Sequence, residues 1–189
     1  MNTIKICFIS RIQTKKNLKY AIECLNGVDK NIEVYFDIYG PSENEIYFND
    51  SLRTLKYTSK NIFWNYKGIL THDEIINTIM EYDLFFLPTL SENFGHIIYE
   101  ALVANVPILI SDQTPWNDIN DYFAGSALPL DNQIGFVQYI EKVAKLNFEE
   151  IDELRENVKK YLENKINLDE IQNEYLDIFN SVIKINEGS

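Results

Sequence analysis

The chain has 189 residues, of which 46% are hydrophobic and 24% are charged. These values are typical of a folded globular domain and exclude a disordered or low-complexity chain. Its 17 basic and 29 acidic residues give a net charge of −12, which argues against general nucleic-acid binding and means that an anionic ligand needs a local basic cluster. Cys7 and Cys24 lack metal-ligand or redox spacing, so we expect two small core residues in a reducing compartment.

The first predicted strand, residues 4–9, leads into the basic loop SRIQTKKN at residues 10–17. A helical stripe follows at Leu18, Ile22 and Leu25. The planar guanidinium of Arg11 and the ammonium of Lys16 suit a phosphate. A simple solvated loop would have the same composition, and the residues alone favour that reading.

The next elements alternate between strands and helices. We predict strands over residues 32–39 and 61–66, each closed by a glycine, at Gly40 and Gly68. A polar helix is expected over residues 43–59, and a second helix runs from His72 to Tyr82. Thr71 and Glu74 form a capping box at its start. We expect His72, in its first turn, to face the solvent.

The central stretch is SENFGHIIYEAL at residues 91–102, between apolar strands at 83–88 and 107–112. A strand, loop, helix and second apolar strand make a βαβ unit and hence a parallel sheet. Ligands of such sheets bind beyond the carboxyl ends of the strands. Four residues of the helix share one face and should pack on the sheet: Ile97, Ile98, Ala101 and Leu102.

The polar residues of this stretch have a spacing that suits a ligand. Glu92 stands just ahead of the helix, where free amides and the helix dipole favour a phosphate or hydroxyl groups. Gly95 allows close approach to the backbone. Glu100 lies about one turn from His96, and its carboxylate can accept two hydrogen bonds from the paired hydroxyls of a ribose. Alternatively, Glu92 merely favours the dipole and Glu100 is solvated.

The remaining chain completes the alternation. Asn105 should close the central helix in a left-handed conformation. A short helix begins near Pro115, and Trp116 is expected to pack rather than stack on a base. A last strand and three helices are predicted over residues 125–130, 132–146, 148–162 and 168–185.

These residues carry a resemblance to a known family. Glu92, Phe94, Gly95, Glu100 and Ala101 match the two-glutamate signature of retaining glycosyltransferases with the GT-B fold, especially glycosyltransferase family four. The following segment, DQTPW at 112–116, looks like its usual continuation in bacterial polysaccharide transferases.

The basic loop strengthens the resemblance. Arg11 and Lys16 match the Arg and Lys that contact the donor diphosphate in the family. Ser10 and Asn17 stand where the family usually has glycines. Because Asn tolerates left-handed backbone angles, we expect the loop to be preserved.

The resemblance implies the fold. We expect an α/β, Rossmann-like three-layer domain with a parallel sheet of about six strands, helices on both faces and further C-terminal helices. Residues 1–189 would form this single donor-binding domain. Relatives normally carry a second Rossmann-like domain in front, which recognises the acceptor and on which the helix at 168–185 would dock. We therefore expect this chain alone to transfer sugar poorly or not at all.

The resemblance also implies a reaction. The chain would contribute to transfer of a hexose from a UDP- or GDP-linked donor to a glycan or lipid-linked acceptor, in bacterial surface polysaccharide synthesis. Arg11 and Lys16 would neutralise the diphosphate, Glu92 would lie near the transferred sugar, and Glu100 would hold the ribose. No metal or other cofactor is expected. Lacking an apolar run of about 18 residues, the protein is expected to be cytoplasmic, and a membrane-bound acceptor would bring it to the inner membrane surface.

Further binding residues follow from the same resemblance. The amides of Asn93, Phe94 and Gly95 would hold sugar hydroxyls or phosphate, and His96 would reach the phosphate or remain on the helix surface. The backbone near Tyr66 and Gly68 would flank the base. Gly40 would line the donor cleft or form a plain turn.

Two other functions stay open at this stage. The chain could be a stand-alone, non-catalytic nucleotide-sugar-binding or partner module, or half of a sugar-nucleotide epimerase of similar architecture. The pattern from Glu92 to Glu100 fits transferases better than epimerases. The base, sugar, linkage, acceptor, mechanism of retention and oligomeric state are not determined by these residues.

Overall fold

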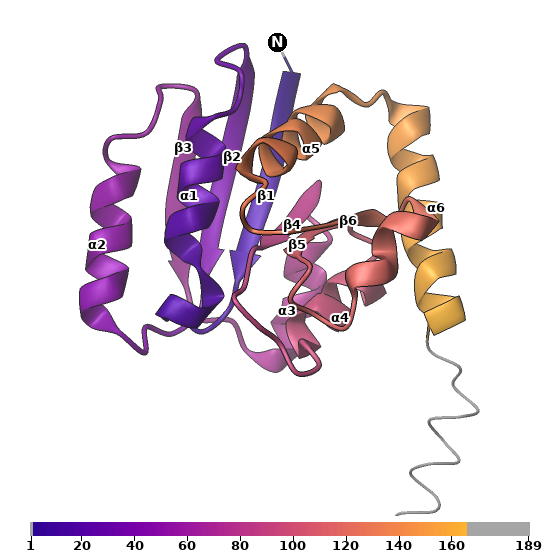
Figure 1. The fold of residues 1–189 in the computed structure, drawn as a ribbon, viewed down its shortest axis with the longest axis horizontal. Coiled ribbons are helices and arrows are strands. Elements are labelled where there is room, and N and C mark those ends of the chain that lie inside the picture. The colour runs from indigo at the N-terminus through magenta and orange to yellow at the C-terminus, as the bar shows by residue number, and fades with distance from the viewer. Residues whose placement is uncertain (1, 166–189) are drawn as a thin grey trace, which may run out of the picture.

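Six parallel strands form one sheet in the order β3-β2-β1-β4-β5-β6 (Figure 1). The computed structural model describes residues 2–165 of the chain. The strands are β1 (Asn2–Ile9), β2 (Ile32–Tyr39), β3 (Ile62–Gly68), β4 (Leu84–Leu87), β5 (Ile108–Ser111) and β6 (Gly125–Leu128). The strand order reverses between β1 and β4, which is the switch point where α/β sheets bind ligands.

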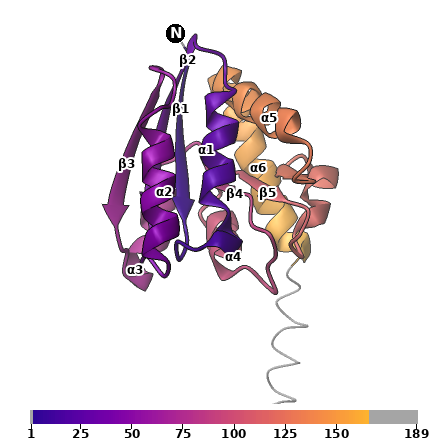
Figure 2. The same ribbon diagram turned by 60° about the vertical axis from the view of Figure 1, so that its left-hand side comes forward.

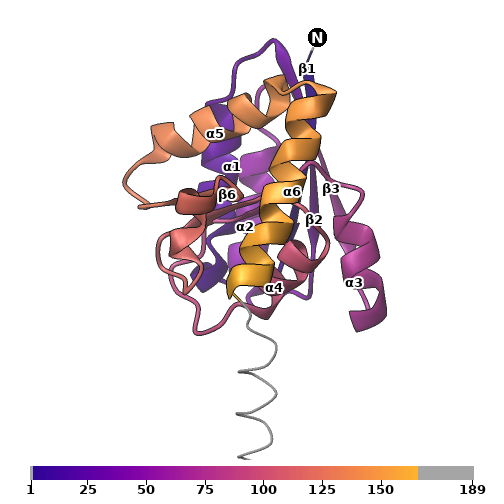
Figure 3. The ribbon, with the colours of Figure 1, turned by 90° about the vertical axis from the view of Figure 1, so that its right-hand side faces the viewer.

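Helices cover both faces of this sheet (Figure 3). On one face α1 contacts both α2 and α5, and Figures 1 and 2 show α1 beside α2. On the other face α4 contacts α3 and α6. The helices are α1 (Leu18–Asn26), α2 (Glu45–Leu55), α3 (His72–Ile79), α4 (His96–Val103), α5 (Gln133–Lys145) and α6 (Phe148–Lys165), with short 3₁₀ helices η1 (Thr14–Lys16) and η2 (Asn117–Tyr122). The predicted Rossmann-like, three-layer α/β fold is confirmed.

The central strands are apolar because helices cover both of their faces. Every residue of β4 and β5 is buried. Strand β2 alternates instead, and Tyr35 on its less covered side is exposed and stacks on Phe63 of β3, with ring centroids 5.0 Å apart. Cys7 and Cys24 are buried and reduced, as predicted for core residues.

Several predicted boundaries were wrong by a few residues. The helix expected over 43–59 covers only Glu45–Leu55, since its N-cap Asn44 accepts the Tyr47 N–H and begins the helix there. The short helix predicted to begin near Pro115 is present, as the 3₁₀ helix η2. The strand expected over 125–130 ends at Leu128. The helix expected at 168–185 lies outside the described residues.

Local predictions at three other positions are confirmed. Glu74 accepts hydrogen bonds from the backbone N–H and the hydroxyl of Thr71, both at 2.8 Å, as in a capping box. Asn17 and Asn105 adopt left-handed conformations, with φ of 61° and 55°. Between residues 2 and 165, no helix has both the length and the apolar character that crossing a membrane requires.

Candidate functional site

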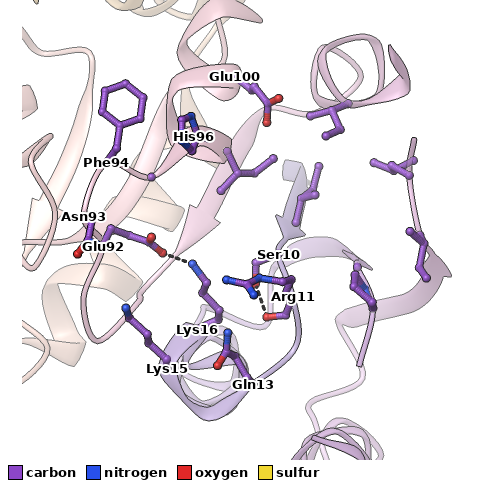
Figure 4. Close-up of a pocket in the computed structure, with 18 residues that line it drawn as sticks. Ser10, Arg11, Gln13, Lys15, Lys16, Glu92, Asn93, Phe94, His96 and Glu100 are labelled. Carbon is purple, nitrogen blue, oxygen red and sulfur yellow. Dashed lines mark hydrogen bonds and ion pairs between the residues drawn. The ribbon is translucent and has the colours of Figure 1, made fainter. Parts of the chain in front are cut away.

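A cleft of about 560 Å³ opens at the carboxyl ends of β1, β2 and β4 (Figure 4). This is the edge of a parallel sheet where ligands bind. Segments far apart in the sequence meet there. The predicted site residues that line it are Arg11, Lys16, Gly40, Glu92, Asn93, Phe94, Gly95, His96 and Glu100.

One wall of the cleft consists of the loops after β1 and β2, which continue the pairing of their strands. The Ile12 N–H donates to the Pro41 carbonyl at 2.8 Å. Gly40 has a φ of 126°, and a Cβ added there would lie 1.9 Å from the Ser10 carbonyl oxygen. Only glycine can adopt this conformation and leave that space. Gly40 thus both makes the turn and lines the cleft.

The basic loop is tied to the loop that follows β4. The Lys15 carbonyl accepts hydrogen bonds from the Leu90 N–H at 2.8 Å and from the Thr89 hydroxyl at 3.1 Å. The loop after β4 is in turn tied to the loop after β5, because the Glu92 N–H donates to the Gln113 carbonyl at 3.0 Å. These hydrogen bonds fix Lys16 and Glu92 on facing segments.

Lys16 and Glu92 form a buried ion pair at the deep end of the cleft (Figure 4). Their side chains are only 11% and 10% exposed. Lys16 comes from η1 and Glu92 from the loop before α4, and the Lys16 Nζ donates to the Glu92 Oε1. Each charge is largely removed from water, so each depends on the other for stabilisation.

Arg11 forms a second ion pair at the rim. Its guanidinium lies 2.9 Å from Glu43, and the two side chains are 63% and 38% exposed. Water screens such a pair, which therefore contributes little to stability. The guanidinium is free to turn toward an anion in the cleft at little cost.

The start of α4 presents unused backbone donors to the cleft. Gly95 is the N-cap, in a left-handed conformation, and no side chain caps the helix. No hydrogen bond between residues 2 and 165 uses the N–H of Asn93, Phe94, Gly95, His96 or Ile97. Such amides, at the positive end of a helix dipole, favour an anion or hydroxyl oxygens.

Glu100 occupies the opposite end of the cleft, one turn into α4. Its side chain is 14% exposed, and burial raises its pKa above the usual value. The nearby His72 and His96 act in the opposite direction. The Glu100 Oε1 lies 3.4 Å from Nδ1 of His72, whose side chain is 86% exposed. Glu100 is therefore a sheltered carboxylate whose only ion-pair partner among residues 2–165 is a solvated imidazole.

An apolar shelf connects this end of the cleft to β3. It consists of Ile69, Leu70 and Ile75. Tyr66 and Gly68, predicted beside the base, do not line the cleft. They lie behind Gly40, where the Tyr66 hydroxyl donates to the Gly40 carbonyl at 2.9 Å and the Gly40 N–H donates to the Gly68 carbonyl at 2.8 Å.

Aromatic side chains hold the loop before α4 in place from outside. The Trp116 indole N–H donates to the Phe94 carbonyl at 2.6 Å, and the two rings lie 5.4 Å apart. The Phe94 ring also contacts that of His96 and points away from Lys16 (Figure 4). Trp116 is buried, which confirms its predicted packing role.

The prediction for Ile97 holds in part. Ile97 packs against the hydrophobic core as expected, but it is half-buried whereas Ile98 is buried, and it also lines the cleft. A residue on the border of the apolar stripe can contact both the core and the cleft, as Ile97 does.

Residues outside the sequence prediction also belong to the site. Gln13, Lys15 and the apolar shelf line the cleft, and His72 faces Glu100 although its exposure was predicted correctly. The signal for Gln13 and Lys15 was their place in the basic loop. The shelf had a weaker signal, in that Ile69 and Leu70 directly follow a strand. In the described part of the chain, no three His, Cys, Asp or Glu side chains converge as metal ligands.

This arrangement suits one kind of molecule. Cations and free amides at one end favour an anion, a carboxylate at the other favours hydroxyl groups, and the shelf favours an apolar or planar group. An elongated phosphorylated molecule that bears hydroxyls and a flat ring has these features in this order.

Comparisons with known proteins show which family the chain resembles. Residues 1–165 match the family model described as glycosyl transferases group 1. The UDP-N-acetylglucosamine–peptide N-acetylglucosaminyltransferase GtfA subunit of Streptococcus agalactiae is 27% identical over 153 residues, which are 75% of this chain and 28% of that protein.

Solved structures share the fold. Staphylococcus aureus TarM, in a complex that includes UDP, aligns with a TM-score of 0.78 and 20% identity over 93% of this chain and 35% of its own. The pneumococcal O-GlcNAc transferase GtfA, in complex with UDP and GlcNAc, aligns with a TM-score of 0.73 and 16% identity, covering 95% of this chain and 36% of its own. The chain spans 28% and 46% of the lengths of the curated relatives it matches.

Proposed function

The chain belongs to the group 1 glycosyl transferases, and from this premise we propose that it is the donor-binding half of a retaining glycosyltransferase. The donor is a nucleotide sugar with a UDP- or GDP-linked hexose. The names of GtfA and the ligands of TarM favour UDP as the first candidate. The acceptor is a glycan or a lipid-linked sugar in bacterial surface polysaccharide synthesis.

The diphosphate binds at the deep end of the cleft. Lys16 supplies a point charge there, and Arg11 swings in from the rim with a planar pair of donors. The free amides at the start of α4 complete the anion site. As the nucleotide leaves, the same groups stabilise the negative charge that develops on the diphosphate, which is how binding becomes catalysis. No metal is needed for this role.

The nucleoside extends toward the far end of the cleft. Glu100 accepts hydrogen bonds from the two ribose hydroxyls, because a carboxylate can take both at once. The base lies against the apolar shelf formed by Ile69, Leu70 and Ile75. Tyr66 and Gly68 position the backbone from behind rather than touching the base, since both bond to Gly40.

The transferred sugar lies beside Glu92 and Asn93, with His96 at the phosphate. Retention then follows from attack by the acceptor on the same face as the leaving nucleotide, with Glu92 holding hydroxyls of the sugar. A covalent intermediate on Glu92 is the alternative mechanism. A trapped glycosyl adduct detected by mass spectrometry would favour the covalent route.

Acceptor recognition belongs to a second Rossmann-like domain, of the kind that family members carry in front. The chain serves as the donor domain and transfers sugar poorly on its own. Catalysis takes place in the cytoplasm, at the inner membrane surface where the acceptor is lipid-linked. An assay of the isolated chain with added acceptor that gave rapid turnover would contradict this part of the proposal.

One observation carries the proposal: Lys16, the free α4 amides and Glu100 all face a single cleft in a chain of this family. Calorimetric titration with UDP, GDP, ADP and UDP-hexoses tests it. Binding of one nucleotide, weakened about tenfold in Glu100→Ala (about 1.4 kcal/mol), is expected. If no nucleotide binds at millimolar concentration, the donor-binding role is wrong.

A further inference from the structure

The buried pair of Lys16 and Glu92 has a consequence for which ligand the cleft prefers. In the structure the cation best placed for a diphosphate is already neutralised by a carboxylate. Within residues 2–165 neither side chain has a second ion-pair partner. A phosphate that recruits Lys16 therefore separates it from the one group that balances its charge.

Glu92 is the residue that is destabilised when Lys16 moves to a phosphate. Its side chain is 10% exposed, so water cannot fully solvate the carboxylate once Lys16 turns away. A buried charge that loses its partner is strongly unfavourable unless other donors replace that partner. A nucleoside diphosphate has no hydrogen-bond donor to offer the Glu92 carboxylate, and its own negative charge repels that carboxylate. The hydroxyl groups of a sugar on the diphosphate are such donors.

Resting on the proposed donor-binding function, we infer that Glu92 is a specificity-determining residue that makes the cleft discriminate against sugar-free nucleotide. A nucleotide sugar satisfies both members of the pair, its phosphate binding Lys16 and its hydroxyls binding Glu92. The nucleoside diphosphate left after transfer satisfies only Lys16. Glu92 then competes with the diphosphate for Lys16, which lowers the affinity for the product.

The rim pair provides a matched comparison. Glu43 also pairs with a cation of the cleft, Arg11, but both side chains are solvated. Glu43 does not line the cleft, and water replaces Arg11 as its partner at little cost. Removing the Glu43 charge thus reports the general effect of one fewer acidic group near a diphosphate.

The test compares wild type, Glu92→Gln and Glu43→Gln by calorimetry with UDP, UDP-glucose, UDP-galactose and UDP-N-acetylglucosamine. Wild type is expected to bind one UDP-sugar about tenfold more tightly than UDP. Glu92→Gln is expected to bind UDP about tenfold more tightly than wild type does, so that the preference for the sugar nucleotide disappears. Glu43→Gln should keep the wild-type preference.

The opposite results are distinct. If Glu92→Gln leaves UDP affinity unchanged or weakens it, Glu92 only contacts the sugar or supports the loop, and the inference is wrong while the donor-binding function stands. An equal gain in Glu43→Gln would show general electrostatics and also overturn it. Should Glu92→Gln not fold, wild type decides, because equal affinities for UDP and every UDP-sugar contradict discrimination.

A further titration distinguishes failure of the proposed function from failure of the inference. If wild type binds no nucleotide, inorganic pyrophosphate is titrated into wild type and Glu92→Gln. Binding by Glu92→Gln alone would support competition between Glu92 and a diphosphate for Lys16. Binding by neither protein would overturn the inference together with the function.

Discussion

The two ends of the cleft each carry a glutamate, and their neighbours give these glutamates different properties. Glu92 faces the ammonium of Lys16, whose side chain is as buried as its own. Glu100 faces His72, a solvated imidazole that is charged only when protonated. Burial raises the pKa of Glu100, because no fixed cation compensates its charge. Identical side chains in one motif thus have different partners: a buried ammonium at one end and a solvated imidazole at the other.

The largest expected effect is on stability, from a substitution at Gly40 in the wall formed by the loops after β1 and β2. Gly40→Ala places a Cβ against the Ser10 carbonyl oxygen at a φ that only glycine tolerates, so it should cost about 3 kcal/mol of unfolding free energy or more. Gly68→Ala is the control: its φ is also positive, at 87°, but no atom lies within 4 Å of the added Cβ. It should cost about 1 kcal/mol. Urea denaturation measures both, and equal losses would contradict the close approach.

The next largest effect concerns the end of the cleft that holds Lys16 and Glu92. Lys16→Met leaves Glu92 buried without its cation and should lower the free energy of unfolding by about 3 kcal/mol. Arg11→Met removes the solvated partner of Glu43 and should cost about 0.5 kcal/mol or less. Both variants should lose nucleotide affinity, yet only Lys16→Met should lose stability. Similar denaturation midpoints for the two variants would show that burial does not separate the pairs.

The ribose end should respond to pH. Because the folded-state pKa of Glu100 is raised, ionised Glu100 destabilises the fold at neutral pH, and this penalty disappears as the pH falls through that pKa. Glu100→Gln should therefore unfold at a higher temperature than wild type at pH 7, with a difference that shrinks toward acid pH. Thermal unfolding between pH 4 and 7 measures it, and a constant difference would argue against titration of Glu100.

Nucleotide affinity should follow the same titration with the opposite sign. Protonation of Glu100 removes an acceptor of ribose hydrogen bonds, so wild-type affinity should fall as the pH drops. In Glu100→Gln the affinity for a UDP-hexose, whose diphosphate does not titrate in this range, should be lower at pH 7 and should not fall as the pH drops. A wild-type affinity that did not change would contradict the assignment of Glu100 to the ribose.

The smallest effect concerns His72. Its positive field lowers the pKa of Glu100, so His72→Ala should raise that pKa slightly, as an NMR titration of the Glu100 carboxyl would detect. Stability should change by less than about 0.5 kcal/mol, because the side chain is solvated. A large loss of stability would show that His72 is a true structural partner.

The sequence predicted the features of the site that depend on local order. The strand, loop and helix around Glu92 follow from apolar runs and a helical period, and together they place Glu100 on the cleft side of α4. The turn at Gly40 and the left-handed Asn17 follow from the conformations that these residue types prefer. These predictions need no knowledge of distant contacts.

The remaining features depend on contacts between distant segments. Lys16 and Glu92 are 76 residues apart, and each looked like an independent ligand group until the fold placed them together. The approach of His72 to Glu100 depends on how α3 packs beside α4. Ile97 lies at the border of a stripe, where the helical period alone cannot decide between sheet and cleft.

The most direct test of the central claim is a titration of the ¹⁵N-labelled chain with UDP and UDP-hexoses, followed through the backbone amide signals. The account predicts that the largest shifts occur at the free amides of residues 93–97 and in the basic loop at 10–17, with smaller shifts along the shelf at 69–75. Shifts confined to another surface, or none at millimolar nucleotide, would contradict a nucleotide-binding cleft at the carboxyl ends of these strands.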